Sequence, residues 1–463
     1  MLRTLSFCCG FFLLIVAAHA QPTAGDRALA HDARAALKKG IAYFHSLAIE
    51  GGYVYHYTLD LKEKWGEGKT DDRTVEVQPP GTPAVGMSFL AAYRATKDPA
   101  FLQAAEDAAS ALIRGQNALG GWEHKIYFDR PTGRKVSFDD DQSQSAIRFL
   151  IDLDREIDRP ALSEAIEKAL DMMLTAQLKD GGWPHEYPAQ GNYHDYATFN
   201  DGGINDCIRV MLEAYIAYGK SAYLESLRKV GRFLMISQLP PPQPGWAQQY
   251  TEYLQPAWAR AFEPPAVCPQ VTIRNIHSLL DLYLHTGRRE YLEPIPDALR
   301  WLDASRMTNG KWGRFLEIGT NKALYYDRGR IRVNSLEELS LERRTGYSYE
   351  QDLSAPLAAA RSRFEWVSQA SFAAFPASES VLPSRETLLA KRESLAASVR
   401  EIIAAQDAQG RWISAQDRFR KETPGQIWNG EYRTEDRISS AVFNRNVGIL
   451  CAFLALEEAL KGG

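Results

Sequence analysis

The sequence predicts an all-α fold in which repeated helical hairpins close into an α/α toroid. Three observations lead to this prediction. Apolar patterns of helical period recur along the chain, a tryptophan follows each of them at a nearly fixed distance, and long loops occur on only one side of every unit. Such hairpins can stack as an open, peptide-binding solenoid or curl into a ring. Because loops on one side of a closed ring meet at one mouth, we favour the toroid.

The repeat unit is a helix, a tight turn, a second helix and a long loop led by tryptophan. The first helices are expected at residues 85–95, 144–153, 204–218 and 272–285. The second helices start at Leu102, Leu162, Leu224 and Leu292, and each leads after 20 to 22 residues to Trp122, Trp183, Trp246 or Trp312. A weaker unit begins at Arg27, and a later one ends at Trp412. Steps of 61, 63 and 66 residues between these four tryptophans suit two helices of about fifteen residues and two unequal loops.

Composition and the N-terminus limit the class of protein. The chain has 463 residues, 45% apolar content and a net charge of −4, with no basic block that would favour nucleic acid as a partner. Arg3, an apolar run over residues 7–17 and Ala18-His19-Ala20 have the order of a secretory signal peptide cleaved after Ala20. No later stretch is expected to cross a membrane. We therefore expect a secreted or periplasmic protein that is monomeric and has no membrane partner.

Acidic residues stand directly before two of the predicted helices. Asp139-Asp140-Asp141 precedes one helix, and Asp201 stands in the same place one repeat later, 62 residues after Asp139. Acidic residues at a helix start often serve only as caps. Three in a row exceed that need, and a hard cation with oxygen ligands would relieve their repulsion. Because both loops would face the same mouth of a ring, we predict a metal site formed by Asp139, Asp140 and Asp201.

Basic and aromatic residues gather in the later loops. Arginine suits bidentate recognition of carboxylates, and tryptophan or tyrosine faces suit sugar rings. Taken singly, each arginine could be a surface ion pair and each repeated tryptophan a packing residue. Together they predict a cleft for an anionic sugar polymer. Its candidate substrate-binding residues are Trp183, Trp246, Arg314, Arg328, Arg343, Arg344 and Tyr347.

Such a polymer can be cleaved by β-elimination. This reaction needs a base for the proton α to the carboxylate and a cation for the enolate-like charge, but it needs no nucleophile. Motifs for a nucleophilic serine, a zinc protease, a nucleotide phosphate loop or a dinucleotide are absent from the sequence. His185 and His194 are candidate bases, although histidines beside tyrosines are as often structural.

Several short motifs resemble the pectate lyases of polysaccharide lyase family 10. The resemblance covers roughly Val85 to Tyr349. It is carried by Gly181-Gly182-Trp183-Pro184, Thr198-Phe199-Asn200-Asp201-Gly202, Gly245-Trp246-Ala247-Gln248-Gln249-Tyr250, Arg260-Ala261-Phe262-Glu263-Pro264-Pro265, Gly319-Thr320-Asn321 and Glu342-Arg343-Arg344-Thr345-Gly346-Tyr347. Two departures are Asp139-Asp140-Asp141-Gln142-Ser143, where the family tends to have Asp-Asn-Gly-Ala-Thr, and His185, where it has glutamine.

The resemblance implies an α/α toroid that cleaves polygalacturonate by calcium-assisted β-elimination. It implies Asp139 and Asp201 near calcium and the substrate carboxylate, Arg260 as the base, and Arg328 and Arg344 as substrate-binding arginines. Residues 21–350 would form the catalytic toroid. Residues 351–463 would form a C-terminal helical extension packed on it, after a surface connection at about residues 362–391.

Two other functions remain open from the sequence. An α/α-toroid glycoside hydrolase acting on uronic-acid sugars would use two of Asp139, Asp201 and Glu263 as its acid and base. A non-catalytic acidic-polysaccharide-binding protein would keep the cleft without turnover. Formation of an ultraviolet-absorbing unsaturated product separates elimination from both.

Overall fold

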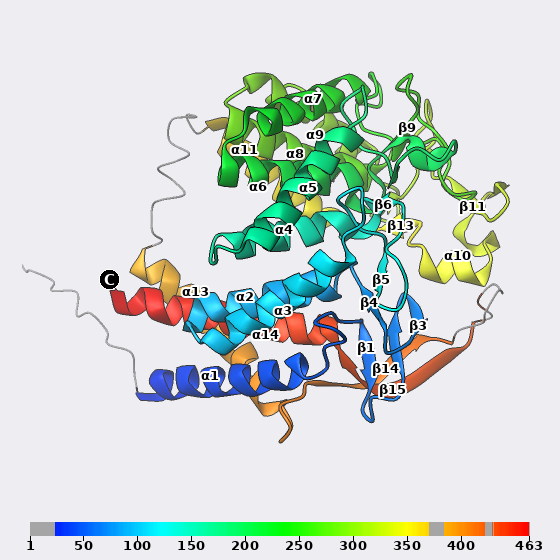
Figure 1. The fold of residues 1–463 in the computed structure, drawn as a ribbon. Helices are drawn as coiled ribbons and strands as arrows, with labels where there is room; N and C mark the ends of the chain where they lie inside the picture. Colours follow the sequence, from blue (N-terminus) through cyan, green and yellow to red (C-terminus); the bar gives the residue numbers. More distant parts are fainter. Residues whose placement is uncertain (1–23, 370–383, 422–427, 429, 463) are drawn as a thin grey trace, which may run out of the picture.

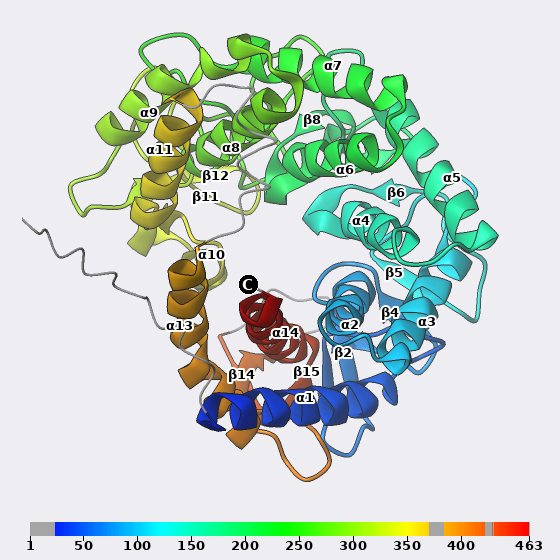
Figure 2. The same ribbon diagram turned by 90° about the vertical axis from the view of Figure 1, so that its left-hand side faces the viewer.

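The structure is a computed structural model, and it describes residues 24–369, 384–421, 428 and 430–462. The expected signal peptide, residues 1–20, lies outside the described residues. The predicted toroid is confirmed, because the helices form two layers around a ring (Figure 2). The inner layer contains α2 (Thr82–Thr96), α4 (Gln142–Asp154), α6 (Gly203–Tyr218), α8 (Pro269–Thr286) and α14 (Ser440–Gly462). The outer layer contains α1 (Ala24–His45), α3 (Pro99–Gly115), α5 (Pro160–Ala176), α7 (Ser221–Ser237), α9 (Ile295–Ala304) and α13 (Arg385–Ala404).

Tight turns join each inner helix to the outer helix that follows it. α2, α6 and α8 end at Lys97, Gly219 and Gly287, each in the left-handed conformation with φ of 58°, 64° and 71°. The backbone N–H of each of these residues donates to a carbonyl of the last helical turn, which satisfies one of the free acceptors there. Prolines at the first helical positions then start α3 and α5. The four inner helices predicted between residues 85 and 285 are confirmed.

Helices from the two ends of the chain complete the ring. α14 packs against α1, α2 and α13, and α11 (Ser354–Gln369) packs against α8 and α9. α11, α13 and α14 are therefore part of the ring and not an addition to its surface. The stretch 362–391, expected as a surface connection, contains the end of α11 and the start of α13, and residues 370–383 between them lie outside the described part.

A glutamine at the end of several outer helices ties neighbouring units together. The side-chain amide of Gln177 donates to Gly181 O in its own loop at 2.9 Å and to Ser226 O in the next outer helix at 3.0 Å. Gln406, after α13, makes the equivalent pair of bonds to its own loop and, at 2.9 Å, to Ala36 O in α1. The bond that joins consecutive units thus also joins the last unit to the first.

The repeated tryptophans are packing residues. The indole N–H of Trp183 donates to Met173 O at 2.9 Å, and that of Trp246 donates to Leu234 O at 2.8 Å, so each ring fastens a loop to the outer helix before it. Trp122, Trp312 and Trp412 do the same in their units. Trp183 and Trp246 are both 0% exposed. The prediction that they contact substrate is wrong, because an indole without exposed surface cannot stack on a sugar.

The long loops lie at one end of the ring, where short strands link them (Figure 1). The sequence did not predict these strands. Two-stranded pairs are β4 (Thr74–Glu76) with β5 (Lys125–Tyr127), β6 (Val136–Ser137) with β7 (Glu186–Tyr187), β8 (Ala197–Thr198) with β9 (Gln249–Tyr250), β10 (Trp312–Gly313) with β13 (Glu350–Gln351), and β11 (Tyr325–Asp327) with β12 (Ile331–Val333). A five-stranded sheet has the order β14 (Ile413–Arg420), β15 (Tyr432–Ser439), β1 (His56–Thr58), β2 (Lys64–Gly66), β3 (Gly68–Thr70). All pairs are antiparallel. The pairs β4–β5, β6–β7, β8–β9 and β1–β15 fasten one loop to the next around the rim, whereas β2–β3, β10–β13, β11–β12 and β14–β15 pair within a single loop.

Among the described residues, one helix, α14, is long and apolar enough to span a membrane, over Ser440–Lys461. The expectation that no later stretch reaches that length is therefore corrected. Half of this stretch is buried inside the ring, where Glu457 and Asn446 are also buried and Glu457 bonds to Arg392 of α13. We interpret α14 as a core helix of the toroid, whose apolar length reflects its contact with three other helices.

We predict that Trp183→Ala lowers the free energy of unfolding by about 3–5 kcal/mol, because it leaves a large cavity and an unpaired carbonyl between loop and helix. Thermal or urea denaturation measures the loss. The matched control is Trp366→Ala, which removes an indole that is 51% exposed on α11 and should cost much less. Equal losses for the two variants would contradict the proposed packing role of the repeat.

Candidate active site

Two short 3₁₀ turns lie side by side at the mouth of the ring. They are η1 (Asp139–Asp141), which precedes α4, and η3 (Asn200–Gly202), which precedes α6. Asp140 has φ 47° and ψ 38°, and Asp201 has φ 45° and ψ 22°. Both are in the left-handed region, which few residues other than glycine adopt and which is often found at functional sites. The backbone therefore pairs Asp201 with Asp140, 61 residues earlier, and corrects the expected equivalence with Asp139.

The two turns bring three carboxylates together. One oxygen from each of Asp139, Asp140 and Asp201 lies within 4.8 Å of the others. The amide of Asn200 donates to Asp201 at 2.9 Å and to Asp139 at 3.4 Å, so it holds two of the three in place. Asp141 is directed elsewhere and pairs with Arg148. We call Asp139, Asp140 and Asp201 the acidic cluster.

Burial and mutual repulsion disfavour negative charge in the acidic cluster. Burial raises the pKa of Asp140 to about 7, and the charges of Asp139 and Asp201 add to the effect. Burial also raises the pKa of Asp139, with a further contribution from Asp201, although His185 opposes it. Carboxylates brought together against their own repulsion bind a proton or a cation more readily than isolated ones. The cluster therefore has the character of a cation site.

The donor set fits a hard cation. Three carboxylates converge, and the buried Oδ1 of Asn200 has no hydrogen-bond partner among the described residues, so it can act as a further oxygen ligand. Oxygen donors of this kind are those that Ca²⁺ prefers. Asp139, Asp140, Asp201 and the Asn200 amide oxygen are the groups that would hold it.

Arg260 reaches the acidic cluster from the loop after α7. Its Nη2 lies 3.7 Å from Asp201 Oδ2, and its guanidinium makes bonds of 2.7 and 2.9 Å to the two oxygens of Glu263. Burial would raise the pKa of Glu263, but the bonds and charge of Arg260 outweigh it and hold the pKa at about 2. Burial opposes the charge of Arg260 as well, yet Glu263 raises the pKa of this guanidinium well above its usual range. Arg260 is therefore a firmly protonated cation in this geometry.

Tyr347 and Arg343 support this pair. Both are buried, and the phenol of Tyr347 donates to Glu263 Oε1. The guanidinium of Arg343 lies 4.1 Å from the centre of the ring of Phe262, two residues after Arg260, and pairs with Glu342. The expectation that Tyr347 and Arg343 bind substrate directly is corrected, because their positions make them supports for Arg260 and Phe262.

The other predicted arginines differ in their distance from the acidic cluster. Arg314 lies 3.9 Å from Asp201 and over the ring of Tyr347 at 4.2 Å, so it is a second cation at the cluster. Arg328 is half exposed, pairs with Glu342 and lies 5.5 Å from the centre of the Phe262 ring. Arg344 is exposed and donates to Glu337 O, away from the cluster. The structure thus brings Arg260 and Arg314 to the carboxylates and leaves Arg328 and Arg344 towards the edge.

Sequence reasoning named His185 and Arg314 but missed His124 and Gln248, and it missed that all four share one position in the repeat. The second residue after each loop tryptophan lies at the rim: His124, His185, Gln248 and Arg314. His185 is buried, bonds to Gln249 at 2.8 Å and has Nδ1 4.0 Å from Asp139. His124 lies 3.3 Å from Glu67. The fixed distance from the tryptophan was the signal that could have identified them.

Backbone bonds explain why this position reaches the rim. The carbonyls of His124, His185 and Gln248 accept from the N–H groups of Val77, Phe138 and Phe199, one loop earlier, at 2.8–2.9 Å. Phe138 directly precedes η1, and Phe199 directly precedes η3. Each of these bonds therefore holds the loop of one unit against the turn of the unit before it. The acidic turns and the residues after the tryptophans are therefore brought to the same mouth by one repeated contact.

Comparison with known proteins identifies a family. A family model described as pectic acid lyase matches residues 128–311 and 296–357, a region that contains the acidic cluster, Arg260 and Arg314. The comparison with curated proteins finds no match.

Two solved structures share the fold. An aspartate-to-alanine variant of a family 10 polysaccharide lyase from Cellvibrio cellulosa, in complex with trigalacturonic acid, is 20% identical with a TM-score of 0.50 and covers 60% of this chain and 98% of that chain. A family 10 polysaccharide lyase from Cellvibrio cellulosa is 18% identical with a TM-score of 0.50, and covers 61% of this chain and 97% of that chain. With the matching family model and the cluster of acidic and basic residues at the mouth of the toroid, the chain belongs to the pectic acid lyase family and is a polysaccharide lyase.

Proposed function

We propose that the chain is a pectate lyase that cleaves polygalacturonate by calcium-assisted β-elimination. The observation that carries this proposal is the convergence of three carboxylates within 4.8 Å, with the guanidinium of Arg260 3.7 Å from one of them. A polymer of uronic acids presents carboxylates that a cation held by aspartates and a pair of arginines would recognise together. The complex of a structural relative with trigalacturonic acid supports this choice of substrate.

The reaction removes the proton α to a sugar carboxylate and expels the glycosidic oxygen from the neighbouring carbon. Calcium, when bound by Asp139, Asp140 and Asp201, supplies positive charge for the enolate-like carboxylate that develops. Arg260 and Arg314 lie 3.7 and 3.9 Å from the two oxygens of Asp201, close enough to bind the same sugar carboxylate and orient it. Charge of both signs is thus positioned before the substrate arrives, as electrostatic stabilisation requires.

Arg260 is the proposed base, and this role requires a neutral guanidinium. In the geometry described here Glu263 keeps the guanidinium protonated. Arg260 can take the α proton only after its guanidinium has released a proton to solvent, and the negative charges of Glu263 and Asp201 both oppose that release. Calcium held by the acidic cluster would compensate the charge of Asp201 and lower the pKa of Arg260, which favours the neutral form that a base requires.

The hydrolase alternative fits the geometry less well. Inverting glycosidases keep their two carboxyl groups about 6.5–9.5 Å apart to hold a water between them. Asp139 and Asp201 have oxygens within 4.8 Å of each other, which is too close for that arrangement. Glu263, the third candidate, is 1% exposed and ionised down to about pH 2, so it is not a proton donor. We further propose that the mature protein is secreted or periplasmic, on the basis of the signal peptide expected at residues 1–20, and acts as a monomer.

Incubation with polygalacturonate should produce ultraviolet-absorbing unsaturated ends, and excess chelator should abolish them until calcium is restored. Activity should be lost in chelator because the reaction needs the positive charge of a cation held by Asp139, Asp140 and Asp201. Absorbance and reducing ends are measured together. Reducing ends without absorbance would identify a hydrolase, polymer binding without either would identify a non-catalytic protein, and full activity in chelator would remove calcium from the mechanism.

Arg260→Ala should lower turnover by about 10²–10⁴-fold, because it removes the proposed base. The variant should still bind substrate, so a gel that contains polygalacturonate should still retard it in affinity electrophoresis. The matched control is Arg300→Ala, which removes an exposed arginine of α9 that pairs with Asp297, and it should keep wild-type turnover. Wild-type turnover in Arg260→Ala would reject Arg260 as the base.

Asp140→Asn should raise stability at pH 8 in chelator by about 1–3 kcal/mol. The folded pKa of Asp140 is about 7, above its unfolded value of about 3.9, so folding favours the protonated form. Stability therefore falls as pH rises between these values, and the full cost applies above pH 7. Asparagine has no such cost, so at pH 4 the two proteins should be equally stable.

Denaturation at both pH values, with Asp158→Asn as an exposed control, measures this difference. Added calcium should stabilise the wild type and have less effect on Asp140→Asn. A variant that is less stable than the wild type at pH 8 in chelator would show that Asp140 is not under electrostatic strain.

A further inference from the structure

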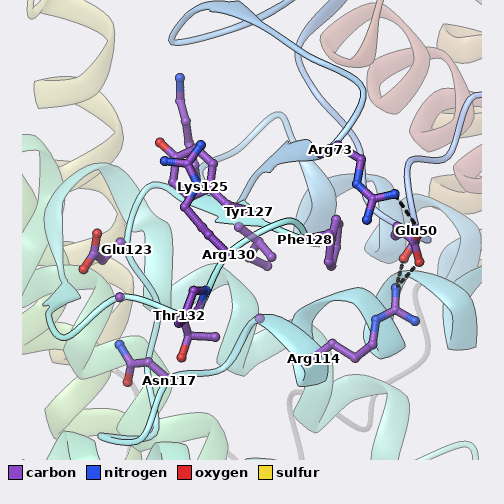
Figure 3. Close-up of a pocket in the computed structure, with 14 residues that line it drawn as sticks. Glu50, Arg73, Arg114, Asn117, Glu123, Lys125, Tyr127, Phe128, Arg130 and Thr132 are labelled. Atoms are coloured by element: carbon purple, nitrogen blue, oxygen red, sulfur yellow. Dashed lines mark hydrogen bonds and ion pairs between the residues drawn. The ribbon is translucent and has the colours of Figure 1, made fainter.

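A separate cavity of about 470 Å³ lies beside the loops that join α1 to α2 and α3 to α4 (Figure 3). This volume is in the usual range for small-ligand sites, about 300–1,000 Å³. Its wall is formed by Glu50, Arg73, residues 114, 115, 117 and 123, and most of the segment 125–133. Most of these residues precede residue 128, where the match to the family begins, so the cavity is largely built from a part of the chain that the family model does not cover.

Positive charge exceeds negative charge around the cavity. Arg73, Arg114, Lys125 and Arg130 line it, against two carboxylates. Figure 3 shows that Arg73 and Arg114 approach the single carboxylate of Glu50, at 3.9 and 3.6 Å. The side chains of these two arginines remain 53% and 49% exposed. Two guanidinium groups that share one carboxylate keep donors available for a second anion.

Aromatic rings accompany these cations. The guanidinium of Arg130 lies 3.9 Å from the centre of the Tyr127 ring, and that of Arg114 lies 5.2 Å from the centre of the Phe128 ring. Tyr127 and Phe128 also line the cavity. A flat ring beside a guanidinium matches a uronic acid residue, which has an apolar sugar face and a carboxylate at its edge. Inorganic anions would use only the charges.

A second, smaller cavity adjoins this site on the side of the acidic cluster. It has a volume of about 300 Å³ and shares Glu123, Lys125 and Tyr127 with the first. Its other end is lined by His124 and Ser137. The hydroxyl of Ser137 accepts from the N–H of Asp139 at 3.3 Å, so this end borders the acidic cluster. Because the two cavities adjoin, together they form a path from Ser137, beside the acidic cluster, to Arg73 and Arg114.

We propose that the cavity at Glu50, Arg73 and Arg114 is a distal subsite that binds a uronate residue of the same polymer, several sugars away from the bond that is cleaved. This inference rests on the proposed function, because it takes the polymer at the acidic cluster to be polygalacturonate. The carboxylate of the distal sugar would bind Arg73 and Arg114, and its ring would lie against Tyr127. The site would make the enzyme prefer long chains, which reach both ends of the path.

Variants at Thr132, an exposed residue of the cavity wall, test this subsite without removing a structural contact. Thr132→Glu places a carboxylate among the arginines, and Thr132→Gln is the control of equal size without charge. The readout is kcat/KM on trigalacturonate and on long oligogalacturonides. The advantage of long chains over the trimer should fall by about ten-fold in Thr132→Glu and stay unchanged in Thr132→Gln.

The double variant Arg73→Gln/Arg114→Gln should reduce the same advantage, with thermal denaturation showing that it is folded. Arg300→Gln on α9 is the matched loss of a remote exposed arginine. A long-chain advantage that survives in both Thr132→Glu and the double variant, or that falls equally in Thr132→Gln, overturns the subsite.

Failure of the subsite can be distinguished from failure of the proposed function. If the wild type makes unsaturated product but its preference for long chains is unaffected by the variants, only the subsite is rejected. If the wild type makes no product, the proposed function is rejected. Affinity electrophoresis in polygalacturonate then still tests the cavity, and equal retardation of Thr132→Glu and Thr132→Gln rejects it.

Discussion

The repulsion among Asp139, Asp140 and Asp201 is the constraint to which the rest of the site responds. Like charges this close are costly unless a proton, a cation or nearby basic groups compensate them. Burial increases the cost, as the raised pKa of Asp140 shows. Arg260 and Arg314 lie close enough to reduce it but do not cancel it. The site therefore stores unfavourable interactions that binding of a cation and an anionic sugar would relieve.

The ring is what holds these charges together. Each loop is fastened to its outer helix by a buried tryptophan and to the next loop by short antiparallel bridges. Closure through Gln406 and Ala36 makes the last unit part of the same circuit. Because the contacts repeat, a carboxylate placed at one position in two successive units must arrive at the same mouth. Rigid support of this kind allows two aspartates to keep left-handed backbone conformations.

The helices and the ring could be predicted from the sequence because their signals are long and periodic. The strands could not, since pairs of two or three residues leave no pattern. Asp140 and Asp201 are equivalent because both have left-handed φ values. The sequence could not show which of the three consecutive aspartates has this conformation. Trp183 and Trp246 were wrongly predicted to bind substrate, because tryptophan is favoured both for packing in a core and for stacking on sugars. Glu50, Arg73 and Arg114 are too far apart in sequence to indicate a shared cavity.

The site as a whole joins a cation-binding cluster to cationic groups on two sides. Arg260 and Arg314 lie at the cluster itself, and a path lined by Lys125 leads outward from it. Calorimetric titration of calcium into the protein at pH 8, compared with Asp201→Asn, measures whether the acidic cluster holds a cation. The wild type should bind one ion, and Asp201→Asn should lose most of that affinity, whereas no binding, or equal binding by both proteins, would show that these carboxylates are not a calcium site.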